Sequence, residues 1–421
     1  MYLPLLLLLP LLAAAPVVVP APDPAVAMLT RDTVLVVAPA DLADAAFALA
    51  LADLQRDFYR VFGSPPVVLN HGPPAHSARP VIALGSAGRA LLPAGDRCVS
   101  TGEAHCVLLK DGTLIATGAA DLGAIYGMYA LSEGVLGVVP LHHFADLPPL
   151  RRRTIALPPG LALRFEPSGW ETRAVFINDE DLTAGFGADP LGDGIGAESY
   201  NCLYEALLRL KCNGVISGTA NFPDQRGGTT LAARRGLRVL QHHVTPVGLN
   251  VMRWPNAPTV GDSLGFSSGG APFSYLNSPA VLEHAWAASI AGLLSALPTT
   301  NANATEDVLW TVGLRGLNDY PWWIDSQGDE RVANLTLRGE VIGRAMSKQL
   351  DLLRSNSRLG TGVQAVAYIW SEMLELWKAG SLKVPEGVTV VFADGGGGKI
   401  QGLDAVRPGD GLVSVQSALP Y

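Results

Sequence analysis

The sequence predicts an α/β protein, with a small α/β domain over residues 31–143 and a (β/α)8-type TIM barrel over residues 169–421. Two observations support this. In the first segment, strand and helix patterns alternate and then lead into a β-hairpin. From residue 169 onward, short apolar runs alternate with helical patterns, which is typical of parallel βαβ units. A proline-rich connector with a basic triplet, Arg151 to Arg153, separates the two at residues 144–168.

The elements of the first domain follow from local signals. Asp41 is expected to cap a helix that ends at Gly63. Asp111 and Gly112 stand between two apolar runs, which predicts a tight hairpin turn. The expected elements are strands at 33–38 and 80–86, helices at 42–63 and 121–137, and a hairpin at 105–118.

The barrel segment contains the longer series of strand patterns. Strands are expected at 173–177, 214–217, 238–242, 308–312, 364–369 and 388–393, with a seventh at 411–418. Helices are expected at 200–211, 280–297 and 331–353. Because eight strands close such a barrel, we expect the barrel to be incomplete at its C-terminal end.

Composition and charge limit the partners. Of the 421 residues 48% are hydrophobic, and the net charge is −8 with a pI near 5.5, which disfavours nucleic acid. Residues 1–27 form an apolar run that ends in small residues, so we expect a signal peptide and a secreted, extracellular protein. Pro16 ends a stretch too short to span a bilayer, so no stable membrane insertion is expected. The oligomeric state stays open.

The four cysteines suggest one disulfide and no metal site. Cys98 and Cys106 bracket a short polar loop that an oxidising compartment would allow to close. Cys202 and Cys212 fall on one predicted helix, about 15 Å apart, which is too far for a disulfide. Since no CxxC or His/Cys cluster occurs, no metal site is expected.

Polar residues follow the apolar runs of the barrel segment. In barrels of this kind the active site lies at the C-terminal ends of the strands. The residues there are Asn178, Asp179, Glu180 and Asp181, then His242, His243 and Thr245, then Arg315, Asn318 and Asp319, then Glu372, and finally Asp394. Paired carboxylates with an arginine and a histidine indicate a glycosidase that acts on an anionic sugar.

Each of these residues also fits a structural role. The acidic cluster fits a solvated helix-capping loop, and the two histidines fit ordinary polar positions at a strand end. Arg315 and Asp319 fit a structural ion pair, and Glu372 opens a helix whose dipole favours an acid in any case. Their shared position at strand ends favours the functional interpretation. Trp254, Trp310, Trp322, Trp323 and Trp370 lie near the same ends and fit either sugar stacking or the core.

At these residues the sequence resembles glycoside hydrolase family 115, the xylan α-1,2-glucuronidases. The resemblance covers roughly residues 31–403. It rests on RAVFINDEDL, ESYNCLYEALLRLKCNGV, LAARRGLRVLQHHVTPVGLN, WTVGLRGLNDYP and SEMLELWKAGSLKVPEGVTVVFAD, and on LGAIYGMYALSEGVLGVVPLHHFAD before the barrel.

The resemblance implies an inverting hydrolase that removes glucuronic or 4-O-methylglucuronic acid from glucuronoxylan. It implies that Glu372 is the general acid and that Asp319 or Asp394 is the base. It also implies that Arg315 and His243 bind the uronate carboxylate, while the remaining candidates line the pocket and bind sugar hydroxyls: Asn178, Asp179 and Glu180. No metal or organic cofactor is implied.

The sequence also departs from the family pattern. Gly395 to Gly398 stand where the family commonly has Asp-Asn-Tyr-Gly, and Thr245 stands where many members have Glu. Residues 411–421 contain no histidine, and the chain ends at Tyr421, so we expect a truncated chain, and whether it is active stays open. Two alternatives follow. A hexosaminidase-like barrel would need an Asp-Glu pair after the fourth strand, where Asn318-Asp319 stands instead; the other is a non-catalytic carbohydrate-binding protein.

Overall fold

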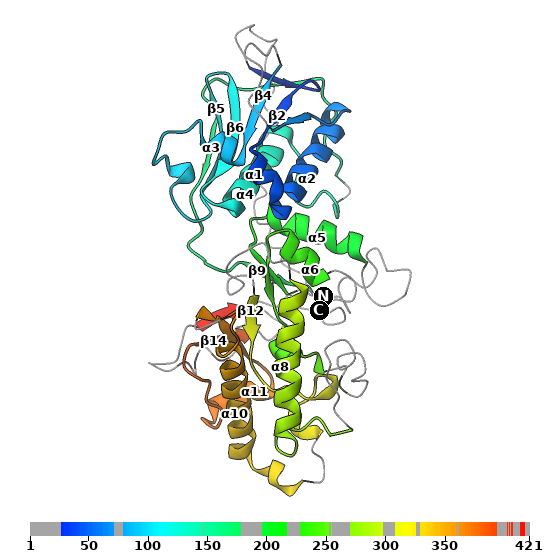
Figure 1. The fold of residues 1–421 in the computed structure, drawn as a ribbon, viewed down its shortest axis with the longest axis vertical. Helices are drawn as coiled ribbons and strands as arrows, with labels where there is room; N and C mark the ends of the chain where they lie inside the picture. Colours follow the sequence, from blue (N-terminus) through cyan, green and yellow to red (C-terminus); the bar gives the residue numbers. More distant parts are fainter. Residues whose placement is uncertain are drawn as a thin grey trace, which may run out of the picture. The chain divides into compact units, whose positions relative to one another are not determined.

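The computed structural model divides the chain into two compact units (Figure 1). Unit 1 comprises Met1–Gly169 and Leu208–Leu210, and unit 2 comprises Trp170–Leu207 and Lys211–Tyr421. The structure describes residues 27–70, 79–145, 147–177, 196–216, 228–251, 254, 270–297, 308–325, 329–359, 362–393, 402, 404, 406 and 413–416.

Unit 1 is built on a mixed six-stranded sheet with the order β3-β2-β4-β6-β5-β8. Its strands are β2 (Val34–Val36), β3 (Val67–Leu69), β4 (Val81–Leu84), β5 (His105–Lys110), β6 (Thr113–Gly118) and β8 (Ala162–Phe165). The predicted hairpin forms as β5 and β6, with Asp111 and Gly112 at positive φ. Neighbouring strands are parallel except at β5, which runs antiparallel to β6 and β8.

The expected connector contains two strands. β8 joins the main sheet, and β7 (Thr154–Ala156) pairs antiparallel with β1 (Met28–Thr30). Residues 144–168, expected as a proline-rich connector, therefore contribute strands to both sheets of unit 1. Both strands are short and pair with segments far away in the sequence, so their own pattern carries little signal.

Helices α2 and α4 pack together in unit 1 and contain most of its buried helical residues. The helical segments are α1 (Pro39–Ala43), α2 (Ala45–Phe62), α3 (Gly85–Arg89), η1 (Arg97–Val99), α4 (Asp121–Leu131) and the π-helical η2 (Ser132–Leu136). Asp44, and not Asp41, caps α2 by accepting from the Phe47 amide at 2.7 Å. Asp41 instead accepts from the Ser86 amide and hydroxyl, a contact 45 residues away that local pattern could not predict.

A buried polar network ties α2 to its neighbours in unit 1. Asp53 and Asp57 are both fully buried. Tyr129 donates to Asp53 at 2.6 Å, and Arg209, from the Leu208–Leu210 segment, donates to Asp57 at 2.6 Å. Ser132 also donates to Asp57. Paired carboxylates of this kind tolerate burial because their oxygens keep hydrogen-bond partners.

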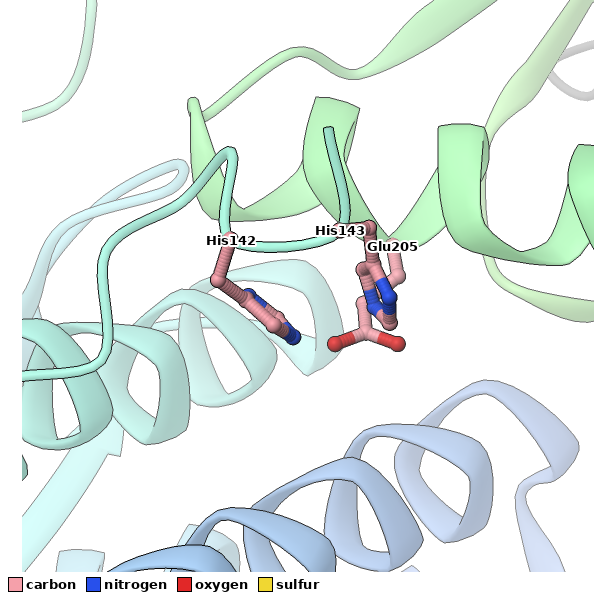
Figure 2. Close-up of side chains that lie close together, drawn as sticks. All are labelled: His142, His143 and Glu205. Atoms are coloured by element: carbon pink, nitrogen blue, oxygen red, sulfur yellow. The ribbon is translucent and has the colours of Figure 1, made fainter. Parts of the chain in front are cut away.

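His142 and His143 follow η2, and their ring centroids lie 3.9 Å apart (Figure 2). His142 Nδ1 lies 3.0 Å from the Val139 carbonyl oxygen, and its Nε2 lies 2.5 Å from an Arg60 nitrogen. Both ring nitrogens of His142 therefore have protein partners within unit 1, which indicates a structural role. Glu205, also drawn in Figure 2, is a residue of unit 2.

Unit 2 is built on a seven-stranded sheet in which every neighbouring pair is parallel. Its strands, in chain order and in sheet order, are β9 (Ala174–Phe176), β10 (Gly214–Ile216), β11 (Arg238–Leu240), β12 (Val308–Thr311), β13 (Ala365–Ile369), β14 (Val388–Ala393) and β15 (Val413–Gln416). All seven expected strands form where they were predicted. The α/β class with a TIM-barrel-type sheet is thus confirmed.

Helical segments separate the strands from β9 to β14, and α8 and α10 run beside one another (Figure 1). The segments are α5 (Ala197–Arg209), α6 (Gly228–Arg234), η3 (Pro246–Gly248), α8 (Pro279–Ala296), η5 (Leu317–Asp319), η6 (Trp322–Ile324), η7 (Glu330–Ala333), α10 (Leu335–Arg354) and α11 (Glu372–Lys378). α5 ends before Cys212, contrary to the predicted helix, and Lys211 beyond its end has a φ of 65°. Among the described residues, no helix is both long and apolar enough to cross a membrane.

A hydrophobic cluster lies on one face of the unit 2 sheet, next to the C-terminal ends of the strands. Side chains from several strands pack into one cluster: Phe176, Ile216, Leu240, Leu309, Val366, Tyr368, Trp370 and Val391. Val366, Tyr368 and Trp370 are spaced by two residues, as strand alternation requires for side chains on one face. Trp370, one residue past β13, is therefore the last member of this layer.

Candidate active site

Four of the predicted site residues lie at the C-terminal ends of three neighbouring strands. His243 follows β11, Arg315 and Asp319 follow β12, and Glu372 follows β13 as the first residue of α11. Because β11, β12 and β13 are parallel neighbours, these ends share one edge of the sheet. The other four candidates, Asn178, Asp179, Glu180 and Asp394, lie outside the described residues.

Arg315 joins the described members of the site. Its Nε donates to Asp319 Oδ1 at 2.6 Å, and its two terminal nitrogens donate to the Asp319 carbonyl oxygen and to Glu372 Oε1. Its guanidinium also lies over the Trp370 ring, 5.1 Å from the centroid. A planar group with several fixed donors can hold two carboxylates in this way, whereas lysine could not.

His243 contacts the same aspartate. His243 Nε2 lies 3.0 Å from Asp319 Oδ1, so this oxygen has both His243 and Arg315 as partners. Exposure decreases across the group. The Asp319 side chain is 36% exposed and His243 20%, while Arg315 is 8% and Glu372 9% exposed. A ligand from solvent would thus meet Asp319 and His243 first.

The pKa values of Arg315 and Asp319 shift as expected for an ion pair. Burial acts to lower the pKa of Arg315, but hydrogen bonds and charges from Glu372 and Asp319 outweigh it and raise this pKa. Burial acts to raise the pKa of Asp319, but its hydrogen bonds with His243 and Arg315 outweigh it and lower this pKa. Asp319 is accordingly held as a carboxylate beside a permanent cation.

Glu372 has one occupied and one open oxygen. Oε1 accepts from Arg315, while Oε2 is buried and has no hydrogen-bond partner within the described part of the chain. A buried carboxylate oxygen without a partner is costly in a structural ion pair. This oxygen can accept a hydrogen bond from a group that enters the site.

Histidine and aromatic rings line one side of the group. The His243 and Trp370 rings meet edge to face, with centroids 4.8 Å apart. The His242 ring centroid lies 3.9 Å from that of His243 and 4.7 Å from that of Phe176. Burial, together with the nearby charges of His243 and Arg315, holds the pKa of His242 well below its ordinary value of 6.5. Val244 N donates to His242 Nδ1 at 3.2 Å, so the neutral ring carries its proton on Nε2.

Two site residues have backbone conformations that disfavour side chains. Asp319 has a φ of 61°, and Ser371, which precedes Glu372, has a φ of 51° and a ψ of −132°. Such conformations persist where the surrounding structure enforces them, and they concentrate at functional sites. Sequence reasoning missed Ser371, because no local signal marks a strained turn.

The arrangement suits an anionic sugar better than a metal. The guanidinium at its centre would repel a cation, and two of its carboxylates already pair with that guanidinium. An arginine, a histidine, an indole face and two carboxylates can bind a uronate and carry out acid–base chemistry. Trp254, Trp310 and Trp322 are buried, and Arg338 lies over the Trp323 ring, 4.3 Å from its centroid, whereas the Trp370 ring contacts Arg315 of the site.

The fold and these residues define the class as a glycoside hydrolase barrel. Residues 169–408, more than half of the chain, match the model of glycosyl hydrolase family 115. The chain belongs to this family, as the sequence resemblance predicted. A search of curated proteins finds no match.

A solved structure of a family 115 enzyme shows the same fold, and two other glycosidase structures are more distantly similar. A family 115 4-O-methyl-α-glucuronidase with specificity for decorated arabinogalactans is 22% identical with a TM-score of 0.70, over 89% of this chain and 46% of that protein. This chain thus spans less than half the length of that enzyme. A chitobiase of Flavobacterium johnsoniae is 11% identical with a TM-score of 0.49, over 94% of this chain and 57% of its own. A β-N-acetylhexosaminidase of Streptomyces coelicolor A3(2) is 13% identical with a TM-score of 0.48, over 88% and 67%.

Proposed function

We propose that the protein is a secreted α-glucuronidase that removes α-1,2-linked glucuronic or 4-O-methylglucuronic acid from glucuronoxylan by an inverting mechanism. The observation that supports this most directly is Arg315, a buried cation in contact with both Asp319 and Glu372 at the strand ends. Family membership and the similarity to a 4-O-methyl-α-glucuronidase agree with it. The apolar run at residues 1–27 supports secretion.

In this proposal the uronate carboxylate enters past Asp319 and His243 and binds Arg315. It takes the place of Glu372 as a partner of the guanidinium. Glu372, released from the guanidinium, takes up a proton from solvent and then donates it to the glycosidic oxygen as the bond between that oxygen and the uronic acid breaks. Trp370 offers an apolar surface against which the sugar ring can stack.

The second carboxylate activates water on the opposite face of the sugar. Asp319 and Asp394 are the two candidates for this base. Asp319 Oδ1 already accepts from Arg315 and His243, and its lowered pKa makes it a weaker base. This favours Asp394 as the base, with Asp319 binding the substrate together with Asn178, Asp179 and Glu180.

Two polysaccharides need to be compared as the substrate of the proposed enzyme. The similar 4-O-methyl-α-glucuronidase is described as specific for decorated arabinogalactans, so arabinogalactan is the natural second substrate to compare with glucuronoxylan. The glycine run at 395–398 and the absence of histidine from 411–421 favour a second function, a carbohydrate-binding protein without turnover.

Release of (4-O-methyl)glucuronic acid from each polysaccharide tests the proposal. We expect turnover by the wild type and a loss of at least about a hundredfold in Glu372→Gln. Glu375→Gln is the matched control, because Glu375 lies one turn along α11 and is exposed. If the protein binds xylan but releases no sugar, the proposed enzyme activity is wrong and the carbohydrate-binding function is supported instead. Equal turnover in both variants would rule out Glu372 as the acid.

A further inference from the structure

The segment that carries Arg315 and Asp319 is a compact loop, residues 313–325, which we call the β12 loop. Its neck is closed by the Gly316 amide, which donates to the Tyr320 carbonyl oxygen at 2.8 Å, and by an antiparallel bridge between Arg315 and Pro321. Asp319 adopts its positive φ inside this loop. Two side chains outside the proposed chemistry hold the loop in place.

The first is Gln349, which is fully buried in α10. Its Oε1 accepts from the Gly313 amide at 2.8 Å, and its Nε2 donates to the Gly313 carbonyl oxygen at 2.8 Å. One side-chain amide therefore satisfies both polar groups of a residue that lies two positions before Arg315. Because α10 is a 20-residue helix, this pair fixes the start of the β12 loop to a rigid element.

The second is Asp325, at the end of the loop. Its Oδ2 accepts from the Leu317 amide at 2.7 Å. The same oxygen lies 2.5 Å from the place where a Cβ on residue 316 would stand, so the carboxylate packs directly against Gly316. This contact fixes the two residues that follow Arg315.

We infer that Gln349 and Asp325 are positioning residues, which hold the β12 loop in the conformation from which Arg315 reaches Asp319 and Glu372 together. Arg315 uses its fork of donors on partners from two different segments, and such contacts are lost when the backbone moves by about 1 Å. Neither positioning residue contacts Glu372 or His243 in the hydrogen bonds described for them, so each acts through the backbone next to Arg315. This inference rests on the proposed function for its catalytic consequence.

The test compares variants that keep or remove these bonds. Gln349→Met retains length and apolar volume but loses both bonds to Gly313. Asp325→Ala loses the bond to Leu317, while Asp325→Asn keeps an acceptor oxygen for it. Leu353→Ala is the stability control, because Leu353 is fully buried on α10 one turn beyond Gln349.

We expect kcat for uronic acid release to fall by on the order of tenfold or more in Gln349→Met and Asp325→Ala. Asp325→Asn should stay near wild type, and Leu353→Ala should keep its kcat below its own unfolding temperature. A Gln349→Met enzyme with wild-type kcat and KM overturns the inference. A loss of kcat in Leu353→Ala equal to that in Gln349→Met overturns it as well.

Amide hydrogen exchange separates this inference from the proposed function. Protection of the Gly313, Gly316 and Leu317 amides should fall in Gln349→Met and Asp325→Ala and not in Leu353→Ala, whether or not the protein turns over xylan. Binding of free glucuronic acid should weaken in the same two variants. If the wild type releases no sugar but these two readouts respond as stated, the proposed activity fails and the positioning roles stand. If exchange in the β12 loop is unchanged, the positioning roles fail.

Discussion

Arg315 is the residue on which the geometry of the site depends. It contacts Asp319 from its own loop and Glu372 from the next strand end, and its guanidinium lies over Trp370. A structural ion pair between Arg315 and Asp319 was the alternative interpretation of the sequence. That pair does form, but the additional contact with Glu372 makes it part of a larger site.

At the residue scale, Asp319 gives a prediction about pH. Its pKa is lowered in the folded protein, so its carboxylate contributes stability above the unfolded value of 3.8, and this contribution is lost as the pH falls through the folded pKa. We therefore expect Asp319→Asn to be less stable than wild type at pH 7. The difference in the free energy of unfolding between the wild type and Asp319→Asn should become smaller below about pH 4.

Urea unfolding at pH 7 and at pH 3 measures this difference. Asp351→Asn is the control, because Asp351 is exposed on α10. If the wild type and Asp319→Asn differ in free energy of unfolding by the same amount at both pH values, the assignment of the lowered pKa to Asp319 is contradicted.

At the scale of the element, the turn from β13 into α11 places Glu372. Ser371 occupies this turn with φ 51° and ψ −132°, a conformation that glycine adopts more easily than serine. The turn directs the residue after it toward the strand ends, where Glu372 meets Arg315. Local strain is thus located next to the proposed acid, as is common where function fixes the backbone.

We expect Ser371→Gly to raise the free energy of unfolding by on the order of 1 kcal/mol, because relief of strain exceeds the entropy that glycine adds to the unfolded chain. Ser355→Gly is the matched control. Ser355 is also exposed and follows α10 with an ordinary φ of −80°, so the substitution should destabilise by roughly 0.5–1 kcal/mol. Chemical denaturation measures both. If Ser371→Gly lowers the free energy of unfolding, the interpretation of the Ser371 backbone as strained is wrong.

At the scale of the whole molecule, the chain has two units that each contain a sheet and a buried core. Cys98 and Cys106 form a disulfide within unit 1, with Cα atoms 5.5 Å apart, as the sequence suggested. In an oxidising compartment this bond limits the freedom of the unfolded chain of unit 1. Unit 2, which contains the proposed active site, does not include it.

Loss of this disulfide should therefore act on unit 1. We expect Cys98→Ala with Cys106→Ala to lower the stability of unit 1 by about 2–3 kcal/mol, as for a short closed loop. Hydrogen exchange should increase in β5 and β6 and stay unchanged in β13. Cys202→Ser, which removes a cysteine outside the disulfide, serves as the control. An equal increase in β13 would contradict this separation.

The sequence by itself determined the α/β class, the seven parallel strands of unit 2 and the family. Each strand there is a short apolar run, so local periodicity is enough to place it. The same rule put His243, Arg315, Asp319 and Glu372 at strand ends, and the structure finds them in one connected group. Motif order along the chain indicated family 115, which the match over residues 169–408 confirms.

Only the tertiary structure decided which side chains meet. Gln349 contacts Gly313, 36 positions away, and Asp41 contacts Ser86, 45 positions away. β8 pairs antiparallel with β5, which lies far from it in the sequence. Such contacts depend on how distant segments pack, and no hydrophobic period or capping signal records them. The sequence therefore placed His243, Arg315, Asp319 and Glu372 at strand ends as candidates, while packing between elements brought them into contact around Arg315.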